Sequence, residues 1–454
     1  MKQQLTFFES IGETVIGIKK NQRIENVFTN SKERVNNGLF IPIKGERFDG
    51  HDFIEEAIDN GAVATYWQKE KQIPKHLQNK IPFIVVNDTL KALQRTAKKF
   101  LEKVQPTVIA ITGSNGKTTT KDLVSSLLSS TFQTHKTQGN FNNHIGMPLT
   151  ILSMEESCEV LILEMGMNHF GEISFLSQLA KPHFAIITNI GDSHLEQLRT
   201  RENIAKAKLE ICDGLAEQGM LLIDGDEPLL PSKLKNTHVI SCGFSDHNEK
   251  KITLLSSNEH EQVFRLNDER STYKLPLLGK HNVKNALYAI VLAKYLGVAE
   301  KKIQKGLASI QLTGMRLQRE RGKNGSLLIN DAYNASPTSM IAALQSLSLL
   351  QDYKKKIAVL GDMYELGESE KSLHEKVANY VGDDIDTIIC IGDKGIWIGE
   401  ALLERKWEGD VIFCHSKEEA LIQLELRLTS ETVVLFKASR GMKLESIVEN
   451  LVSR

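Results

Sequence analysis

Short apolar runs alternate with helix-length amphipathic stretches through the middle of the chain. Residues 107–112, 160–165 and 184–190 are mostly apolar, as strands of a parallel sheet buried on both faces are. Three stretches long enough for helices lie between or after them, at residues 117–130, 171–179 and 201–217. This order of strands and helices predicts a parallel sheet covered by helices.

The same alternation divides the chain into three parts, so the expected fold class is α/β with three domains. Residues 1–104 carry short strand-like runs and end in a helix-length stretch, which predicts a small N-terminal domain. Residues 105–312 hold the parallel series and form the expected central domain. Residues 313–454 repeat the alternation, which predicts a C-terminal Rossmann-like sheet. The polar segment 251–271 is expected to form surface hairpins or loops.

The 454 residues have an ordinary globular composition, with 41% hydrophobic and 25% charged residues. Because 56 Lys and Arg face 57 Asp and Glu, the net charge is -1, and no overall positive field draws the chain to nucleic acid or an anionic membrane. The five cysteines have no CxxC spacing, which predicts buried thiols in a reducing compartment. No apolar stretch approaches the roughly 20 residues of a membrane span, so we expect a cytoplasmic monomer that binds small molecules.

The strongest local motif is a glycine loop between the first buried strand and the next helix. Its candidate phosphate-binding residues are Gly113, Ser114, Asn115, Gly116, Lys117, Thr118 and Thr119. Backbone N–H groups of such a loop cradle phosphates, while Lys117 reaches the β- and γ-phosphates and Thr118 binds Mg²⁺. The strict GxxxxGK[ST] pattern fails, because Ile111 stands where the first glycine belongs and Gly113 supplies the turn. A chance glycine-rich turn is the alternative, and the strand, loop and helix context argues against it.

Two side chains that follow later strands are candidates for metal binding. Glu164 lies at the end of the second buried strand, at the edge of the sheet where ligands of open α/β proteins bind. A carboxylate that caps a surface turn is the alternative interpretation. His194 follows the third strand, and a neutral imidazole near Glu164 would be a suitable ligand for a second metal ion. A lone histidine is, however, more often structural.

Lys208 lies on the apolar side of the helix expected over residues 201–217. On a 100° wheel Ile204, Ile211 and Leu215 form that side, whereas Lys206 is on the polar side. Burial lowers the pKa of a lysine, and the neutral amine can react with CO₂ to form a carbamate. The alternative is a lysine that extends its charged end to solvent past an apolar stem. The helix alone favours neither interpretation.

Seven motifs along the chain carry a family resemblance. They are Thr112-Gly-Ser-Asn-Gly-Lys-Thr-Thr119, Thr137-Gln-Gly-Asn-Phe-Asn-Asn143, Glu164-Met-Gly166, His194-Leu-Glu196, Ala207-Lys-Leu-Glu210, Gly279-Lys-His-Asn-Val-Lys-Asn-Ala286 and Asp331-Ala-Tyr-Asn-Ala-Ser-Pro337. In this order they resemble the Mur ligase family over essentially the entire chain. The resemblance implies an N-terminal domain that holds a UDP-sugar, a central ATPase domain, and a C-terminal domain that closes on ATP and the amine substrate.

The resemblance also implies a role for individual residues. The loop 113–119 and Arg316 would contact the ATP phosphates, Asn282 and Asn285 the adenine, and Asp331 the ribose. Thr118 and Glu164 would hold one Mg²⁺, and His194 with a CO₂-derived carbamate on Lys208 a second. The expected catalytic residues are Lys117, Glu164, His194 and Lys208, and the expected substrate contacts are Ser31, Lys44, Asn140, Asn143, Asn334 and Ser336. One departure is Asn30-Ser31-Lys32, where the family usually has Asp-Ser/Thr-Arg. A lysine offers a point charge in place of a planar fork.

Three segments resemble one branch of the family, namely residues 45–53, 331–337 followed by Ser339-Met340, and 359–367. That branch joins D-Ala-D-Ala to UDP-N-acetylmuramoyl-tripeptide through an acyl phosphate, with release of ADP and phosphate. Whether the third residue of the tripeptide is lysine or diaminopimelate cannot be read from motif spacing.

The sequence disfavours three other functions. Folylpolyglutamate synthase shares the chemistry, but it has its glycine loop near the N-terminus, whereas about a hundred residues precede the loop in this chain. A non-catalytic nucleotide-sugar sensor is disfavoured by the joint presence of Lys117, Thr118, Glu164, His194 and Lys208. A kinase or GTPase is disfavoured because the chain has no Asn-Lys-x-Asp guanine motif and has a second doubly wound domain.

Overall fold

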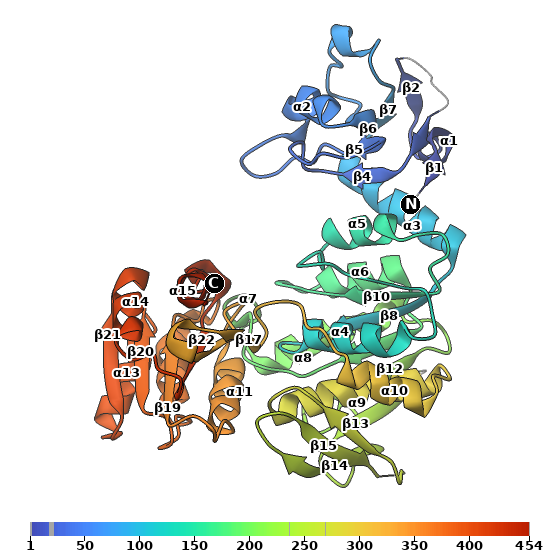
Figure 1. The fold of residues 1–454 in the computed structure, drawn as a ribbon. Coiled ribbons are helices and arrows are strands. Elements are labelled where there is room, and N and C mark those ends of the chain that lie inside the picture. The colour runs from blue at the N-terminus through green and yellow to red at the C-terminus, as the bar shows by residue number, and fades with distance from the viewer. Residues whose placement is uncertain (1, 18–21, 236, 268, 454) are drawn as a thin grey trace.

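The computed structural model of the protein describes residues 2–17, 22–235, 237–267 and 269–453. The chain forms three α/β parts in sequence order, which confirms the predicted fold class (Figure 1). The N-terminal part is blue, the central part runs from cyan to yellow, and the C-terminal part is orange and red. The long helix α3 (Thr89–Val104) runs from the first part to the second.

The N-terminal part is built on a five-stranded sheet of order β2-β7-β6-β5-β4, beside a small β1-β3 pair. Its other elements are β1 (Gln3–Gln4), α1 (Leu5–Glu9), β2 (Thr14–Ile16), β3 (Arg23–Ile24), β4 (Asn26–Phe28), β5 (Gly38–Phe40), α2 (Ile54–Asp59), β6 (Ala62–Gln68) and β7 (Phe83–Val86). Helix α3 begins where the Asp88 carboxylate accepts the Lys91 N–H at 2.9 Å, and it buries Leu93, Ala97 and Phe100. This capped, one-sided helix is the helix-length stretch predicted at the end of residues 1–104.

The central part holds a nine-stranded sheet of order β16-β15-β14-β13-β12-β11-β8-β10-β9. Its elements are β8 (Thr107–Thr112), α4 (Lys117–Leu128), β9 (Thr134–Lys136), α5 (Gly146–Ser153), β10 (Val160–Glu164), α6 (Glu172–Ala180), β11 (Phe184–Ile187), α7 (Leu195–Leu198), α8 (Arg201–Leu209), β12 (Met220–Asp224), β13 (His238–Gly243), β14 (Lys250–Ser257), β15 (Gln262–Leu266), β16 (Thr272–Leu275), α9 (Lys280–Tyr295) and α10 (Glu300–Ala308). The strands from β9 to β14 pair in parallel. Strands β14 to β16 form antiparallel hairpins at one edge, as the polar segment 251–271 predicted.

The C-terminal part is a second, six-stranded sheet of order β17-β18-β22-β19-β20-β21. Its elements are β17 (Gln318–Arg321), β18 (Leu327–Asn330), α11 (Pro337–Ser348), β19 (Lys355–Leu360), α12 (Glu370–Ala378), β20 (Thr387–Ile391), α13 (Ile396–Glu404), β21 (Asp410–Cys414), α14 (Lys417–Glu425), β22 (Thr432–Lys437) and α15 (Glu445–Leu451). All strands but β17 pair in parallel. Ser336 and Ser339 form a capping box at the start of α11, and Pro337 occupies its first turn.

One expected helix is shorter than predicted. The stretch 201–217 is helical as α8 only to Leu209 and continues as a 3₁₀ turn over Glu210–Gly214, so a single wheel over the whole stretch is wrong. The Glu210 carboxylate accepts the Gly171 N–H at 2.8 Å, and Ser177 Oγ accepts the Gly214 N–H at 3.1 Å. These contacts tie the chain to both ends of α6, so the turn tightens and the helix cannot continue.

All five cysteines are free thiols, and four are buried, as expected, while Cys212 is partly exposed. Burial raises the pKa of the Cys390 thiol to about 12, which keeps it protonated and unreactive. Among the described residues, no helix combines the length and apolar composition needed to cross a membrane.

Candidate active site

A cavity of about 360 Å³ lies where the carboxyl ends of β8, β10 and β11 face the C-terminal part. Its central-domain wall includes the glycine loop, Glu164 at the end of β10, and Asn189 just after β11. Its other wall includes Asp331, which follows β18, and Lys437 at the end of β22. The cavity therefore lies at the strand ends of two separate sheets, the position where open α/β sheets bind ligands.

The glycine loop has the backbone of a phosphate site. Gly113 and Gly116 have φ values of 149° and 80°, and a Cβ on Gly113 would lie 1.8 Å from Thr188 Oγ1, so that turn requires glycine. Among the described residues, nothing accepts the N–H groups of Gly116, Lys117 and Thr118. Three free donors at the positive end of α4 suit an anion.

Lys117 lies across this loop. Its Nζ donates to the carbonyl oxygens of Gly113 at 2.6 Å and Ser114 at 3.4 Å. Burial lowers the pKa of Lys117, with Glu164 opposing and Arg316 reinforcing that shift. The ammonium is therefore held directly beside the free loop donors, where it could form an ion pair with a bound phosphate.

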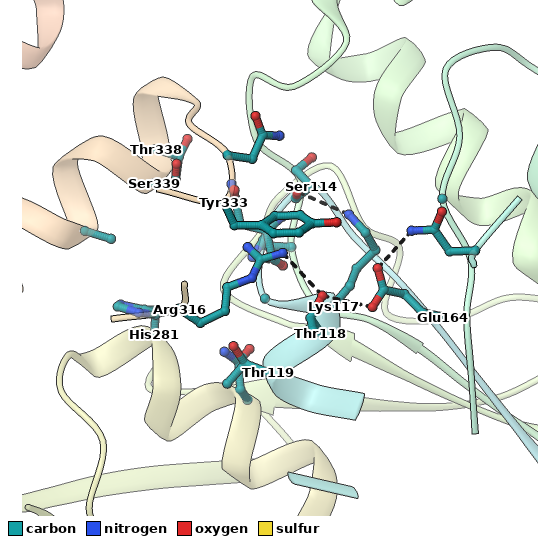
Figure 2. Close-up of a pocket in the computed structure, with 18 of the residues that line it drawn as sticks. Ser114, Lys117, Thr118, Thr119, Glu164, His281, Arg316, Tyr333, Thr338 and Ser339 are labelled. Carbon is teal, nitrogen blue, oxygen red and sulfur yellow. Dashed lines mark hydrogen bonds between the residues drawn. The ribbon is translucent and has the colours of Figure 1, made fainter. Parts of the chain in front are cut away.

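Thr118 and Glu164 form the oxygen-rich side of the cavity. Thr118 Oγ1 donates to Glu164 Oε2 at 2.9 Å (Figure 2). Asn142 Nδ2 donates to Glu164 Oε1 at 2.9 Å. The Glu164 N–H donates to Thr137 Oγ1 at 3.0 Å, which fixes the end of β10. Hydroxyl and carboxylate oxygens in contact suit Mg²⁺, so the residues present fit such an ion. Because Glu164 is buried, it is not a carboxylate that caps a surface turn.

Arg316 reaches this site from the segment that joins the central and C-terminal parts. Its guanidinium stacks on Tyr333, with Cζ 4.1 Å from the ring centroid, and its Nη2 donates to Thr118 Oγ1 at 3.4 Å (Figure 2). Arg316 Nε and Asn115 Nδ2 are buried donors that lack a hydrogen-bond partner among the described residues. Two orphaned donors beside the loop are a further reason to place an anionic ligand here.

Lys208 and His194 line the same cavity. Lys208 is only 2% exposed, and burial lowers its pKa well below the ordinary value, reinforced by Lys117. A lysine that extends its charge to solvent is therefore wrong for this position. His194 Nδ1 lies 2.6 Å from Glu365 Oε2. This contact with His194 lowers the pKa of the Glu365 carboxyl.

Other predicted residues lie in three groups around the cavity. Lys437 Nζ lies 2.5 Å from Asp331 Oδ2 and donates to the Asn334 carbonyl at 3.1 Å. Asn285 Nδ2 donates to Asn282 Oδ1 at 3.1 Å. Ser336 Oγ donates to Asn115 Oδ1 at 3.3 Å, which joins the start of α11 to the glycine loop. Asn143 also lines the cavity.

Four of the predicted substrate residues, namely Ser31, Lys44, Asn140 and Ser336, are outside this cavity lining. Asn140 is exposed, Lys44 is exposed in the N-terminal part, and Ser31 donates to Glu56 Oε2 at 2.5 Å there. Conversely, the sequence prediction missed Asn142, Tyr333, Asn189 and Lys437. The first two stand inside quoted motifs, and the other two follow buried strands, so the rule that ligands bind at strand ends was a signal for them.

The comparisons with known proteins match this architecture. Residues 23–101 match the Mur ligase family catalytic domain, residues 111–293 the Mur ligase middle domain, and residues 315–440 the Mur ligase glutamate ligase domain. The chain thus has the fold and site of a nucleotide-dependent ligase, and it belongs to the Mur ligase family. The resemblance seen in its motifs is confirmed.

Several proteins that are similar to this chain belong to one branch of the Mur ligase family. The UDP-N-acetylmuramoyl-tripeptide--D-alanyl-D-alanine ligase of Bacillus subtilis is 44% identical over 98% of each chain, and the enzyme of that name from Haemophilus influenzae is 33% identical over 95% of this chain and 94% of its own. Among solved structures, MurF from Acinetobacter baumannii covers 99% of each chain with a TM-score of 0.87 at 30% identity. MurF ligase from Thermotoga maritima, solved in complex with ADP, covers 94% of this chain and 96% of its own, with a TM-score of 0.81 at 30% identity.

Proposed function

We propose that the protein is an ATP-dependent ligase that joins D-Ala-D-Ala to UDP-N-acetylmuramoyl-tripeptide in peptidoglycan precursor synthesis. The observation that carries the proposal is the glycine loop with its lysine, placed beside the Thr118–Glu164 pair and opposite Arg316 of the C-terminal side. The likeness to the Bacillus subtilis ligase over 98% of both chains supports the choice of substrates.

Joining a carboxylate to an amine in water is uphill, so the acid must first be activated. The loop N–H groups, Lys117 and Arg316 surround one space with positive charge, which offsets the negative charge on a phosphoryl group passing from ATP to the substrate carboxylate. The products of this step are ADP and an acyl phosphate. The amine then attacks the acyl carbon, and phosphate leaves.

Two metal-binding groups of residues are part of the proposal. Thr118 and Glu164 would hold one Mg²⁺, and His194 with a carbamate on Lys208 a second; such ions would offset charge on the nucleotide phosphates. Lys208 fits the carbamate role because its side chain is buried and makes no hydrogen bond or ion pair with another described residue. A buried neutral amine is the form that combines with CO₂.

The remaining residues are assigned by their place around the cavity or by motif. We propose Arg316 for phosphate, Asn282 and Asn285 for adenine, Asp331 for ribose, Asn143, Asn334 and Ser336 for the peptide substrates, and Ser31 and Lys44 for the UDP-sugar. Domain boundaries near residues 104 and 312 are supported by the end of α3 and by the connector before Arg316. A cytoplasmic monomer remains our expectation.

The decisive experiment incubates the protein with UDP-N-acetylmuramoyl-tripeptide, D-Ala-D-Ala, ATP and Mg²⁺. We expect ADP, phosphate and the UDP-linked pentapeptide, because Lys117 and the loop donors hold the β- and γ-phosphate end. Chromatography of the nucleotides separates the outcomes. AMP and pyrophosphate as products would contradict an acyl phosphate, and the tripeptides with lysine and with diaminopimelate are both assayed.

Acceptor choice is a separate prediction. We expect D-Ala-D-Ala to support turnover at least about tenfold better than D-Glu, L-Lys or diaminopimelate, since tenfold requires only about 1.4 kcal/mol of transition-state discrimination. Product formation with each acceptor at equal concentration measures this ratio. Preference for a single amino acid would move the protein to another branch of the family.

A further inference from the structure

A buried network of charges lies directly behind the glycine loop and has no role in the function proposed above. Lys121 and Asp122, on helix α4, are 1% and 2% exposed. Asp122 Oδ1 accepts a hydrogen bond from Lys136 Nζ at 2.7 Å, and Lys121 Nζ lies 4.0 Å from the same oxygen. Charges buried at this depth are retained at a cost unless they are paired.

The second carboxylate oxygen of Asp122 contacts a segment outside the central sheet. Asp122 Oδ2 accepts the backbone N–H of Thr313 at 2.7 Å, across 191 positions of sequence. Thr313 belongs to the connector between α10 and β17, which leads into the C-terminal part. A charged acceptor on a backbone N–H makes a strong hydrogen bond, so the connector is anchored to the nucleotide-binding helix at this point.

Arg316 follows three residues after Thr313 in the connector, and its Nη2 donates to Thr118 Oγ1. Met315 and Leu317, on either side of Arg316, have φ values of 60° and 49°, a conformation that costs free energy for residues other than glycine. Asp331 Oδ1 accepts the Leu317 N–H at 3.2 Å, so carboxylates hold the connector on both sides of Arg316. Such a backbone persists only where its surroundings fix it.

Lys121 extends the same network to the oxygen-rich side of the cavity. Its Nζ lies 3.8 Å from Glu164 Oε2, so this ammonium is divided between Glu164 and Asp122 and is fully paired with neither. Burial lowers the pKa of Lys121, and both carboxylates oppose that shift. Lys121 therefore lies between Asp122 and the Glu164 carboxylate that accepts the Thr118 hydroxyl.

We propose that Asp122 is a positioning residue that couples the nucleotide-binding helix to the interdomain connector, so that Arg316 is held against the phosphate site. It acts at two places, through the Thr313 N–H on Arg316 and through Lys121 on Glu164. This inference rests on the proposed use of ATP, but the link between Asp122 and Thr313 can be measured without turnover.

The first test is hydrogen exchange of the full-length protein without nucleotide. Asp122→Ala should speed exchange of the Thr313 amide about tenfold or more, because that N–H loses its acceptor. Peptides from β10 and β18 should exchange as in the wild type, which separates loss of the link from general unfolding. Unchanged exchange at Thr313 would overturn the proposal, whatever the protein catalyses.

The second test asks whether Asp122 and Thr313 act together through their hydrogen bond. Thr313→Pro removes the donor and leaves the buried charges intact, and we expect it and Asp122→Ala each to lower kcat/KM for ATP about tenfold, with KM for the UDP-linked substrate unchanged. Because Thr313→Pro changes a partly exposed connector residue and removes no buried charge, it also serves if Asp122→Ala fails to fold. The kcat/KM for ATP of the double variant should lie within about twofold of that of the less active single variant.

Gln311→Pro is the matched control. It places the same rigid residue in the same connector, at an exposed position whose N–H donates to no described residue. Its kcat/KM for ATP should stay within about twofold of the wild type. Equal losses in the two proline variants, or losses that simply multiply in the Asp122→Ala/Thr313→Pro double variant, would refute the coupling through this hydrogen bond.

Discussion

Replacing Lys117 with Met is expected to lower kcat by about 10²-fold or more, the loss typical when one preorganised group that stabilises transition-state charge is removed. Lys117 Nζ is held 2.6 Å from the Gly113 carbonyl, beside the free N–H groups of the loop. Methionine keeps most of the length of the side chain but has no charge. Initial rates of ADP release measure the effect.

Two further measurements make that result specific. Lys117→Arg should also lose most activity, because a planar fork cannot replace a compact ammonium between the Gly113 and Ser114 carbonyls. Lys91→Met, at an exposed position on α3, is the control and should be near normal. If Lys117→Met turned over ATP at close to the wild-type rate, the phosphate role of the loop would be refuted.

The sequence predicted the parts of the site that a single strand, loop and helix create. The loop 113–119 could be read because β8 and α4 are adjacent in sequence, and φ values that suit glycine fall where the sequence has Gly113 and Gly116. Glu164 could be read for a similar reason, since a buried run ends on it. Local order along the chain determines these positions.

The missed residues depend on how distant segments meet. Tyr333 matters because Arg316, from the connector, stacks on it, and Lys437 matters because β22 lies beside β18 in the second sheet. No hydrophobic periodicity encodes the docking of one sheet against another. The early end of α8 is a similar case, because the contacts of Glu210 and Gly214 with α6 override a helical pattern.

Lys208→Ala is expected to abolish most activity while the fold survives. Lys208 is 2% exposed, lines the cavity with Glu164 and His194, and has no ion-pair partner among the described residues. Burial lowers the pKa of Lys208 well below its ordinary value, which favours the neutral amine, the form that reacts with CO₂. A carbamate there would be a carboxylate-like ligand longer than glutamate, and alanine supplies none.

The alanine variant leaves space that a small carboxylate can enter, so acetate or formate should partly restore turnover in a concentration-dependent way. Lys206→Ala is the matched control, because Lys206 lies two positions away on the exposed side of α8. It should keep near-normal rates and show no response to acetate. Near-normal turnover of Lys208→Ala, or a bare ammonium at Lys208 in a high-resolution map with ATP and Mg²⁺ bound, would refute the carbamate.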